Sequence, residues 1–215
     1  MEKIKAIIFD LDGTLADTLP LCIEAFRKSV EPIAQRSITD EEIIATFGPS
    51  EEGTIMKLVP DHYEKGIADY LRFYEELHHK CEKPFTGMAD ILKKLKTRYI
   101  KLAMVTGKGR YSTAVSLKQF GMTDLFEIIE TGSPEGPRKA EGIQYVIDQW
   151  TDIKKTEMIY VGDAPGDIIA SKQTGIPVVA AAWAGTAEPE KLIPLKPEAI
   201  FYNIAEFSEW LQTNT

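Results

Sequence analysis

The sequence has no long apolar segment, few cysteines and a shortage of basic residues. No apolar run approaches the roughly 20 residues that cross a bilayer. The short apolar stretch near the N-terminus ends at Asp10 without the features of a signal peptide, which predicts a cytoplasmic protein with no membrane partner. Cys22 and Cys81 are too few for a disulfide framework and lack a metal-binding spacing, so we expect reduced thiols with packing roles. The 25 basic residues against 33 acidic ones disfavour nucleic acid as a partner.

Short apolar segments alternate with helical patterns over most of the chain. Met88, Ile91, Leu92 and Leu95 have helical spacing, and similar patterns cover residues 143–150 and 167–174. Alternating strands and helices predict an α/β fold, a doubly wound parallel sheet with helices on both faces. The expected strands are residues 4–9, 102–105, 126–129, 158–161, 178–182 and, more weakly, 199–202.

The pattern changes between the first and second expected strands, where residues 18–84 read as consecutive helices. Thr39 and Glu42 have the spacing of a capping box. Apolar residues from Tyr63 to Leu77, including Tyr70 and Tyr74, form a stripe that we interpret as a packing face in preference to a binding surface. The sequence therefore predicts a catalytic core of residues 1–17 and 85–215, and an inserted all-helical cap of residues 18–84.

Polar residues follow four places where the predicted core changes from strand or loop to helix. In open α/β sheets, active sites lie beyond the carboxyl ends of the strands, so these residues are expected to meet. They are Asp10-Leu11-Asp12-Gly13-Thr14, Thr106-Gly107-Lys108, Arg138-Lys139, and Gly162-Asp163 with Asp167.

The carboxylates of this set need a positive charge between them. Aspartate and glycine are also ordinary turn residues, but Asp163 and Asp167 are expected beside Asp10 and Asp12, and four clustered carboxylates would repel one another. Hard oxygen ligands suit Mg²⁺, and Lys139 would add a fixed positive charge. We therefore favour a magnesium site over turn chemistry.

These motifs, taken in order, resemble those of the haloacid dehalogenase superfamily, specifically its phosphoglycolate phosphatase-like group with a helical cap. The resemblance covers the whole chain. It rests on Asp10-x-Asp12-Gly13-Thr14, Thr106, Lys139 and Gly162-Asp163-x-x-x-Asp167. Asp12 separates this chain from the dehalogenases, which lack the second aspartate, and from the phosphonatases, which carry a small residue there.

The resemblance implies a role for each residue. Asp10 would be the nucleophile and a metal ligand, and Asp12 the general acid and base, with its backbone carbonyl also on the metal. Asp163 would bind Mg²⁺, and Asp167 would support the metal's water ligands or Lys139. Thr106, the backbone amide of Gly107 and Lys139 would bind the phosphoryl group.

The predicted function is Mg²⁺-dependent hydrolysis of a small phosphate monoester, phosphoglycolate or a related metabolite, through an aspartyl-phosphate. The chain differs from the phosphoglycolate phosphatases in having Gly107 after Thr106, Lys139-Ala140-Glu141 as its lysine motif, and a loop rich in glycine and proline at residues 132–137. Alternatives are a sugar phosphomutase or a pyrophosphatase of the same superfamily. A non-catalytic module that binds a phosphorylated metabolite is the alternative from another class.

One segment of the predicted cap carries a further expectation. Residues 46–53 interrupt two helices and include Gly48, Pro49 and Gly53. Glycine allows backbone to approach a ligand closely, and in capped relatives the corresponding loop faces the active site. We therefore expect this loop to contact the leaving group, and Glu51 and Glu52 either to point away or to select a neutral or cationic one.

Overall fold

The computed structural model describes residues 2–215 and contains a six-stranded parallel sheet in the order β3-β2-β1-β4-β5-β6. β1 lies at the centre, with Phe9 opposite Met104 of β2 and Val161 of β4. The predicted doubly wound α/β fold is confirmed. The strands are Ala6–Phe9, Lys101–Val105, Ile128–Glu130, Met158–Gly162, Val178–Ala181 and Ala199–Phe201, for β1 to β6.

Successive side chains of a strand point to opposite faces, and this alternation builds two hydrophobic layers. Ile7 and Phe9 of β1 pack in one layer, and Ala6 and Ile8 pack in the other. The first layer is covered by α5 (Met88–Thr97), α6 (Arg110–Gln119) and α10 (Ile204–Asn214). The second is covered by α7 (Lys139–Gln149), α8 (Pro165–Thr174) and α9 (Pro189–Leu192), with η3 (Lys155–Glu157) and η4 (Ile193–Leu195) as short turns.

Two features of the core differ from the sequence-based expectations. The third strand begins at Ile128, not at residue 126, because Phe126 packs in the hydrophobic layer just before it. Helix α6 was not predicted, and its buried face explains why. That face contains Ser112, Thr113 and Ser116, so the apolar repeat that marks an amphipathic helix is absent.

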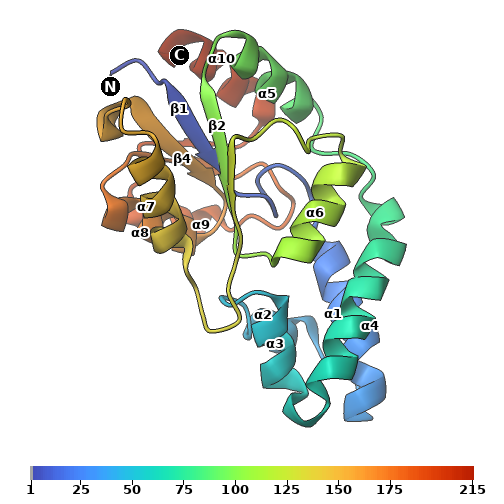
Figure 1. Ribbon diagram of the computed structural model, residues 1–215. Coiled ribbons are helices and arrows are strands. Elements are labelled where there is room, and N and C mark those ends of the chain that lie inside the picture. Colours follow the sequence, from blue (N-terminus) through green and yellow to red (C-terminus); the bar gives the residue numbers. More distant parts are fainter. Residues whose placement is uncertain (1) are drawn as a thin grey trace.

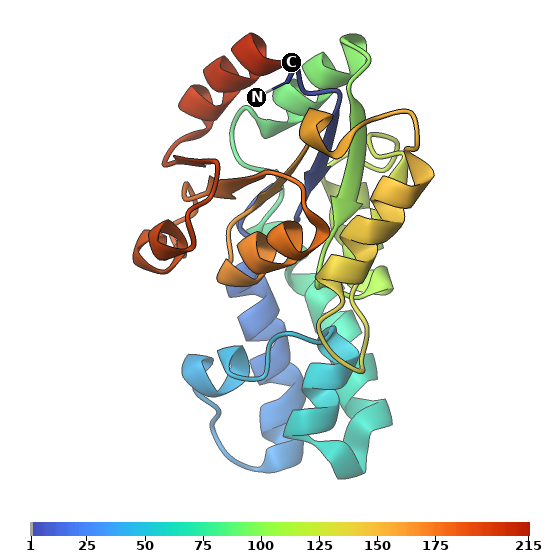
Figure 2. The same ribbon diagram turned by 90° about the vertical axis from the view of Figure 1, so that its left-hand side faces the viewer.

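Between β1 and α5 the structure has helices and loops but no strand, and these helices form a separate layer below the sheet in both views (Figures 1 and 2). Phe26, Ile55, Tyr70 and Tyr74 share a hydrophobic cluster there, so the tyrosine stripe does pack. Thr39 and Glu42 form the predicted capping box. The helices are α1 (Leu19–Ala34), α2 (Asp40–Ile44), α3 (Glu51–Leu58) and α4 (Tyr63–Leu77), with η1 (Pro60–His62) and η2 (His78–Lys80).

The loop between β3 and α7 crosses from the sheet to this helical layer, where it meets the segment before α3 (Figure 1). The Ser50 amide donates a hydrogen bond of 2.9 Å to the Ser133 carbonyl. Gly132 is required at this crossing, because a Cβ on it would lie 2.0 Å from the carbonyl oxygen of Gly107. The glycine- and proline-rich stretch of the sequence is thus a docking point between the two layers.

Within residues 2–215, no helix is both long enough and apolar enough to cross a membrane. Cys22, which is buried, and Cys81, which is half-buried, are both free thiols, as the sequence predicted.

Candidate active site

Three carboxylates and one lysine gather beyond the carboxyl ends of β1 and β4. Asp10 follows β1, Asp163 follows β4, Asp167 lies in the first turn of α8, and Lys139 opens α7. Carboxylate oxygens of the three aspartates lie within 4.8 Å of one another. We call Asp10, Asp163, Asp167 and Lys139 the strand-end cluster. The structure thus brings these residues together as the sequence predicted, whereas their chemical roles stay predictions.

Lys139 is held between two of the aspartates. Its ammonium group contacts Asp10 Oδ2 and Asp167 Oδ1. Asp167 is fixed in turn by the Ala164 amide, which donates at 2.9 Å, and by the Tyr160 hydroxyl, which donates at 3.1 Å. Asp167 therefore orients Lys139 toward Asp10.

The electrostatics of the strand-end cluster leave an excess of negative charge. Burial raises the pKa of Asp10 to about 6, even though Lys139 opposes the shift. Burial also raises the pKa of Asp163 well above its ordinary value, and the neighbouring Asp167 and Asp10 add to the effect. For Lys139, burial lowers the pKa, but the attraction of Asp10 and Asp167 outweighs it and the net pKa is raised. Three carboxylates facing one ammonium group fit a divalent cation with hard oxygen ligands.

Gly13 allows the first loop to fold tightly over this cluster. Its φ of +72° favours glycine, and a Cβ at this position would lie 2.1 Å from Asp163 Oδ2. The next residue, Thr14, donates a hydrogen bond of 3.0 Å to Asp163 Oδ1. The Asp-Gly-Thr sequence is thus required for Asp163 to approach the end of β1.

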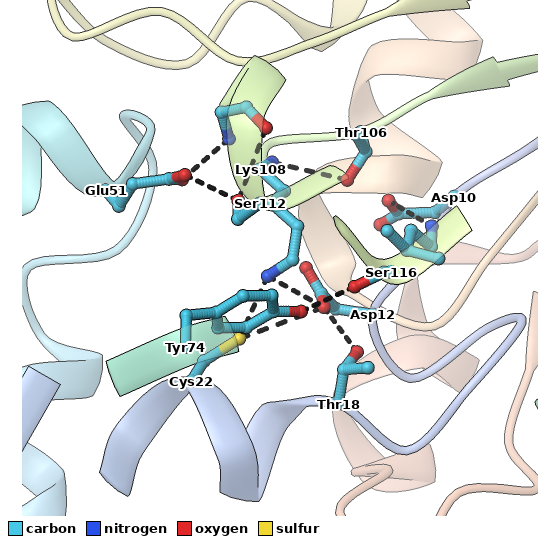
Figure 3. A network of polar contacts seen from close by, with 12 residues as sticks. Asp10, Asp12, Thr18, Cys22, Glu51, Tyr74, Thr106, Lys108, Ser112 and Ser116 are labelled. Atoms are coloured by element: carbon cyan, nitrogen blue, oxygen red, sulfur yellow. Dashed lines mark hydrogen bonds and ion pairs between the residues drawn. The ribbon is translucent and has the colours of Figure 1, made fainter. Parts of the chain in front are cut away.

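The side chain of Asp12 does not join the strand-end cluster. It faces Lys108, whose ammonium nitrogen lies 3.2 Å from Asp12 Oδ1, and it accepts a hydrogen bond from the Thr18 hydroxyl (Figure 3). The expectation that four carboxylate side chains share one point is therefore wrong for Asp12. The attraction of Lys108 provides the physical reason. That the backbone carbonyl of Asp12 binds the metal stays a prediction.

Lys108 is buried where the core meets the helical segment. Its ammonium group also contacts Cys22 Sγ at 3.0 Å and lies 4.5 Å from the centre of the Tyr74 ring. Burial lowers the pKa of Lys108, but the acidic groups around it, Asp12 foremost, together outweigh that effect and the net pKa is raised. Burial raises the pKa of Cys22 to about 12, so its sulfur is a thiol at neutral pH. Lys108 is consequently a cation whose charge is already balanced by Asp12.

Glu51 of α3 links the helical segment to the start of α6 by two hydrogen bonds. Its carboxylate accepts a 2.6 Å hydrogen bond from the Gly109 amide and another from the Ser112 hydroxyl (Figure 3). Burial raises the pKa of Glu51, although Lys108 opposes the shift. Glu51 therefore does not point away from the core, and its oxygens are engaged by α6. Glu52 interacts with the Ser50 hydroxyl.

The remaining predicted phosphate-binding residues also reach the site. Thr106 is buried at the end of β2, and its Oγ1 accepts a hydrogen bond of 3.2 Å from the Lys108 amide. Both Thr106 and Gly107 line the cavity described below. Arg138 instead pairs with Glu130 at 3.2 Å and does not line that cavity.

A cavity of about 560 Å³ connects the strand-end cluster to the helical segment. The helical side contributes Leu19, Phe26, Phe47 and Tyr70 to its lining. Gly48 and Pro49 also line it, so this part of the predicted 46–53 loop faces the site. The predicted loop is too long, because Ser50 is the N-cap of α3 and residues 51–53 belong to that helix. Whether the loop touches substrate stays a prediction.

Sequence reasoning missed the contacts that join the core to the helical segment. Lys108 was visible beside Thr106, but nothing in the sequence pointed to Asp12 as its partner. Cys22 was expected only to pack, and Glu51 was expected in the 46–53 loop, whereas the structure places it in the first turn of α3. Their partners depend on how the two layers meet, which local sequence patterns do not encode.

Comparison with known proteins identifies the family. The family model described as haloacid dehalogenase-like hydrolase matches residues 7–181. The chain is 30% identical to the pyrophosphatase PpaX of Halalkalibacterium halodurans over 188 residues, covering 85% of each protein. It is 28% identical to the PpaX of Bacillus mycoides over 183 residues, covering 84% of this chain and 85% of that one.

Solved structures share the same fold. A haloacid dehalogenase-like family hydrolase from Streptococcus pneumoniae has a TM-score of 0.78 at 26% identity, covering 97% of this chain and 99% of that one. A predicted phosphoglycolate phosphatase from Haemophilus somnus has a TM-score of 0.80 at 21% identity, covering all of both chains. Because the family model matches residues 7–181, most of the chain, this protein belongs to the haloacid dehalogenase-like hydrolases.

Proposed function

We propose that this protein is a Mg²⁺-dependent phosphatase that hydrolyses a small phosphate monoester through an aspartyl-phosphate on Asp10. The observation that carries the proposal is the strand-end cluster, in which the Lys139 ammonium group contacts carboxylate oxygens of Asp10 and Asp167 and Asp163 lies beside them. A carboxylate can approach a phosphate dianion only where cations neutralise the charge of both groups.

Each residue of the site has a separate role in the proposed reaction. Asp10 attacks phosphorus, and the P–O bond to the alcohol breaks as the bond to Asp10 forms. Asp12, which takes up a proton as the substrate binds, gives that proton to the leaving alcohol oxygen. Asp12 then takes a proton from water, which hydrolyses the acyl phosphate and frees Asp10. Thr106 and the Gly107 amide hold the phosphoryl oxygens, and Lys139 balances their charge throughout.

Asp10, Asp163 and the backbone carbonyl of Asp12 would hold the metal, with Asp167 supporting its water ligands or Lys139. The clustered carboxylate oxygens fit Mg²⁺, a hard cation that accepts one or two carboxylates and keeps several waters. When bound, Mg²⁺ supplies positive charge that offsets the charge on the transferring phosphoryl group. In this proposal the helical segment, residues 18–84, acts as the cap that encloses the leaving group.

The test is phosphate release from a panel of phosphorylated metabolites, with and without chelator. We expect activity to disappear in chelator and to return with added Mg²⁺, and calorimetry to detect Mg²⁺ binding that Asp163→Asn weakens. Full activity in metal-free buffer would refute the metal requirement. No phosphate release from any substrate would favour a binding module instead.

A second candidate is pyrophosphate hydrolysis, which the name of the PpaX relatives supports. The same cluster would serve it, because only the leaving group changes. Comparing kcat/KM for pyrophosphate with kcat/KM for phosphate monoesters separates the two candidates. A sugar phosphomutase is distinguished by isomerisation of a sugar phosphate without net phosphate release.

A further inference from the structure

Each lysine that lines the cavity is paired with an aspartate, and Glu51 adds a further carboxylate to the lining. Among its lining residues, all within the described range 2–215, the cations are Lys108 and Lys139. Lys139 is engaged by Asp10 and Asp167, and Lys108 by Asp12. Glu51 lines the same region. A second anionic group of a substrate would therefore lie beside Glu51 and would have to compete with Asp12 for Lys108.

The wall of the cavity instead offers exposed apolar side chains. Phe47, in the 46–53 loop, is 36% exposed, and Ile169, on α8 of the core, is 47% exposed. Both line the cavity, one from the helical segment and one from the core. Apolar side chains gathered in a hollow are typical of a ligand-binding groove, where a ligand shields them from water.

The apolar surface continues inward from Phe47. The Phe47 and Phe26 rings lie 5.9 Å apart between centres, and Phe26 packs on Tyr70 at 4.3 Å. All three line the cavity. Its volume of about 560 Å³ falls within the roughly 300–1,000 Å³ of pockets that enclose organic ligands. The cavity thus has room for a ring or chain beyond the phosphoryl group.

From these observations we infer that the leaving group is an uncharged alcohol with an apolar ring or chain, seated between Phe47 and Ile169. The inference rests on the proposed phosphatase function and names its substrate class. The phosphoryl group lies at Thr106 and Lys139, and the organic part extends along the aromatic wall. Pyrophosphate and phosphoglycolate, whose leaving groups are anionic, are disfavoured because the cavity holds no unpaired cation among its described lining residues.

The experiment compares kcat/KM for benzyl phosphate, ethyl phosphate, phosphoglycolate and pyrophosphate in the full-length protein with Mg²⁺. Benzyl and ethyl phosphate both release an alkoxide oxygen on a CH₂ group, so they differ chiefly in the apolar ring. One apolar contact in a specificity pocket changes kcat/KM by about 10–200-fold. We expect benzyl phosphate to exceed ethyl phosphate by at least about tenfold, and both anionic substrates to fall below benzyl phosphate.

Paired variants separate a specificity role from a structural one. Phe47→Ala and Ile169→Ala should each reduce the benzyl-to-ethyl ratio of kcat/KM by about tenfold. The controls are Ile44→Ala in the helical segment and Ile193→Ala in the core. These residues are 46% and 53% exposed and do not line the cavity, so their ratios should equal that of the wild type. Phe47→Arg should raise kcat/KM for phosphoglycolate relative to kcat/KM for benzyl phosphate, because it adds an unpaired cation.

The outcomes distinguish this inference from the proposed function. Acetyl phosphate, whose small leaving group needs few cavity contacts, tests phosphoryl transfer by itself. If acetyl phosphate is hydrolysed but kcat/KM for pyrophosphate or phosphoglycolate exceeds kcat/KM for benzyl phosphate, the inference is overturned and the phosphatase function stands. An unchanged benzyl-to-ethyl ratio in both Phe47→Ala and Ile169→Ala overturns it equally. If none of the five compounds is hydrolysed, the proposed function itself fails.

Discussion

Two lysines that line the same cavity each pair with aspartates, but Lys108 is buried and Lys139 only partly buried, and they are held in different ways. Lys139 contacts Asp10 and Asp167, and all three belong to the α/β core. Lys108 contacts Asp12 from the core but also Cys22 of α1, and lies over the Tyr74 ring of α4. The first group is complete within the core, whereas the second requires the helical segment.

The two groups are therefore expected to serve different parts of the reaction, phosphoryl transfer and release of the leaving group. The strand-end cluster holds charge where the phosphoryl group is proposed to transfer, and it needs only the sheet and the helices that follow it. The Lys108 group holds Asp12 at the junction with the helical segment, where the leaving group is proposed to lie. Changes in the first group should therefore affect every substrate, and changes in the second should depend on the leaving group.

The largest effect is expected from Asp10→Asn, because an amide is a poor nucleophile. Removing the nucleophile should lower kcat on the order of 10³-fold or more for every substrate. Intact-protein mass spectrometry should show no phosphate on the variant after exposure to substrate. Asp90→Asn, at an exposed position of α5, is the matched control and should keep wild-type kcat. Covalent phosphate on the Asp10→Asn protein would contradict the proposed nucleophile.

Lys139→Ala should follow, with a loss of kcat of about 10²–10³-fold, typical of removing one charge-stabilising group. Steady-state kinetics at saturating substrate measure it, with exposed Lys93→Ala as the control. The loss should be similar for ethyl phosphate and acetyl phosphate, since both transfer the same group. Near wild-type rates would move the role to Lys108, because Arg138 pairs with Glu130 outside the cavity.

Lys108→Met should have a smaller effect that depends on the leaving group. The variant keeps the apolar stem but removes the ammonium group 3.2 Å from Asp12 Oδ1. A misplaced general acid should lower kcat by about tenfold or more for ethyl phosphate, and by less for acetyl phosphate, whose leaving group needs little protonation. Lys108→Arg should recover part of the loss. Equal losses for the two substrates would mean that Lys108 only supports the fold.

Glu51→Gln should give the smallest effect, on stability and not on catalysis. Burial raises the pKa of Glu51 above its ordinary 4.5. In the pH window between 4.5 and this raised pKa, Glu51 binds more protons in the folded protein than in the unfolded chain. The free energy of unfolding contributed by this group therefore falls as pH rises through the window. Glutamine can still accept from the Gly109 amide and donate to Ser112, but it does not titrate.

Urea unfolding of both proteins at pH 4.5 and pH 7 measures this prediction. The stability of Glu51→Gln relative to the wild type should increase from the lower to the higher pH. Glu52→Gln is the control, because Glu52 is less buried and contacts the Ser50 hydroxyl within its own segment. A pH-independent difference, or one of opposite sign, would show that Glu51 is not held in a site that penalises its charge.

Much of the core and of the strand-end cluster could be predicted from sequence. Strands buried on both faces carry apolar runs, and in a parallel sheet their carboxyl ends meet at one edge. Asp10, Thr106 and Asp163 each follow such a run, so their convergence is a consequence of topology. Helix α6 was missed because its buried face is polar, with Ser112 and Ser116 bonded to groups of the helical segment.

The sequence by itself determined the fold class, the all-helical insertion and the residues at the strand ends, because each is encoded by a local pattern of a few residues. Only the tertiary structure decided that Asp12 turns to Lys108, that Glu51 bonds to the Gly109 amide 58 positions away, and that Phe47 and Ile169 line one cavity. These contacts join a loop or helix of the insertion to the core. They depend on the angle and distance at which two separately packed layers meet, and no periodicity within either segment specifies that geometry.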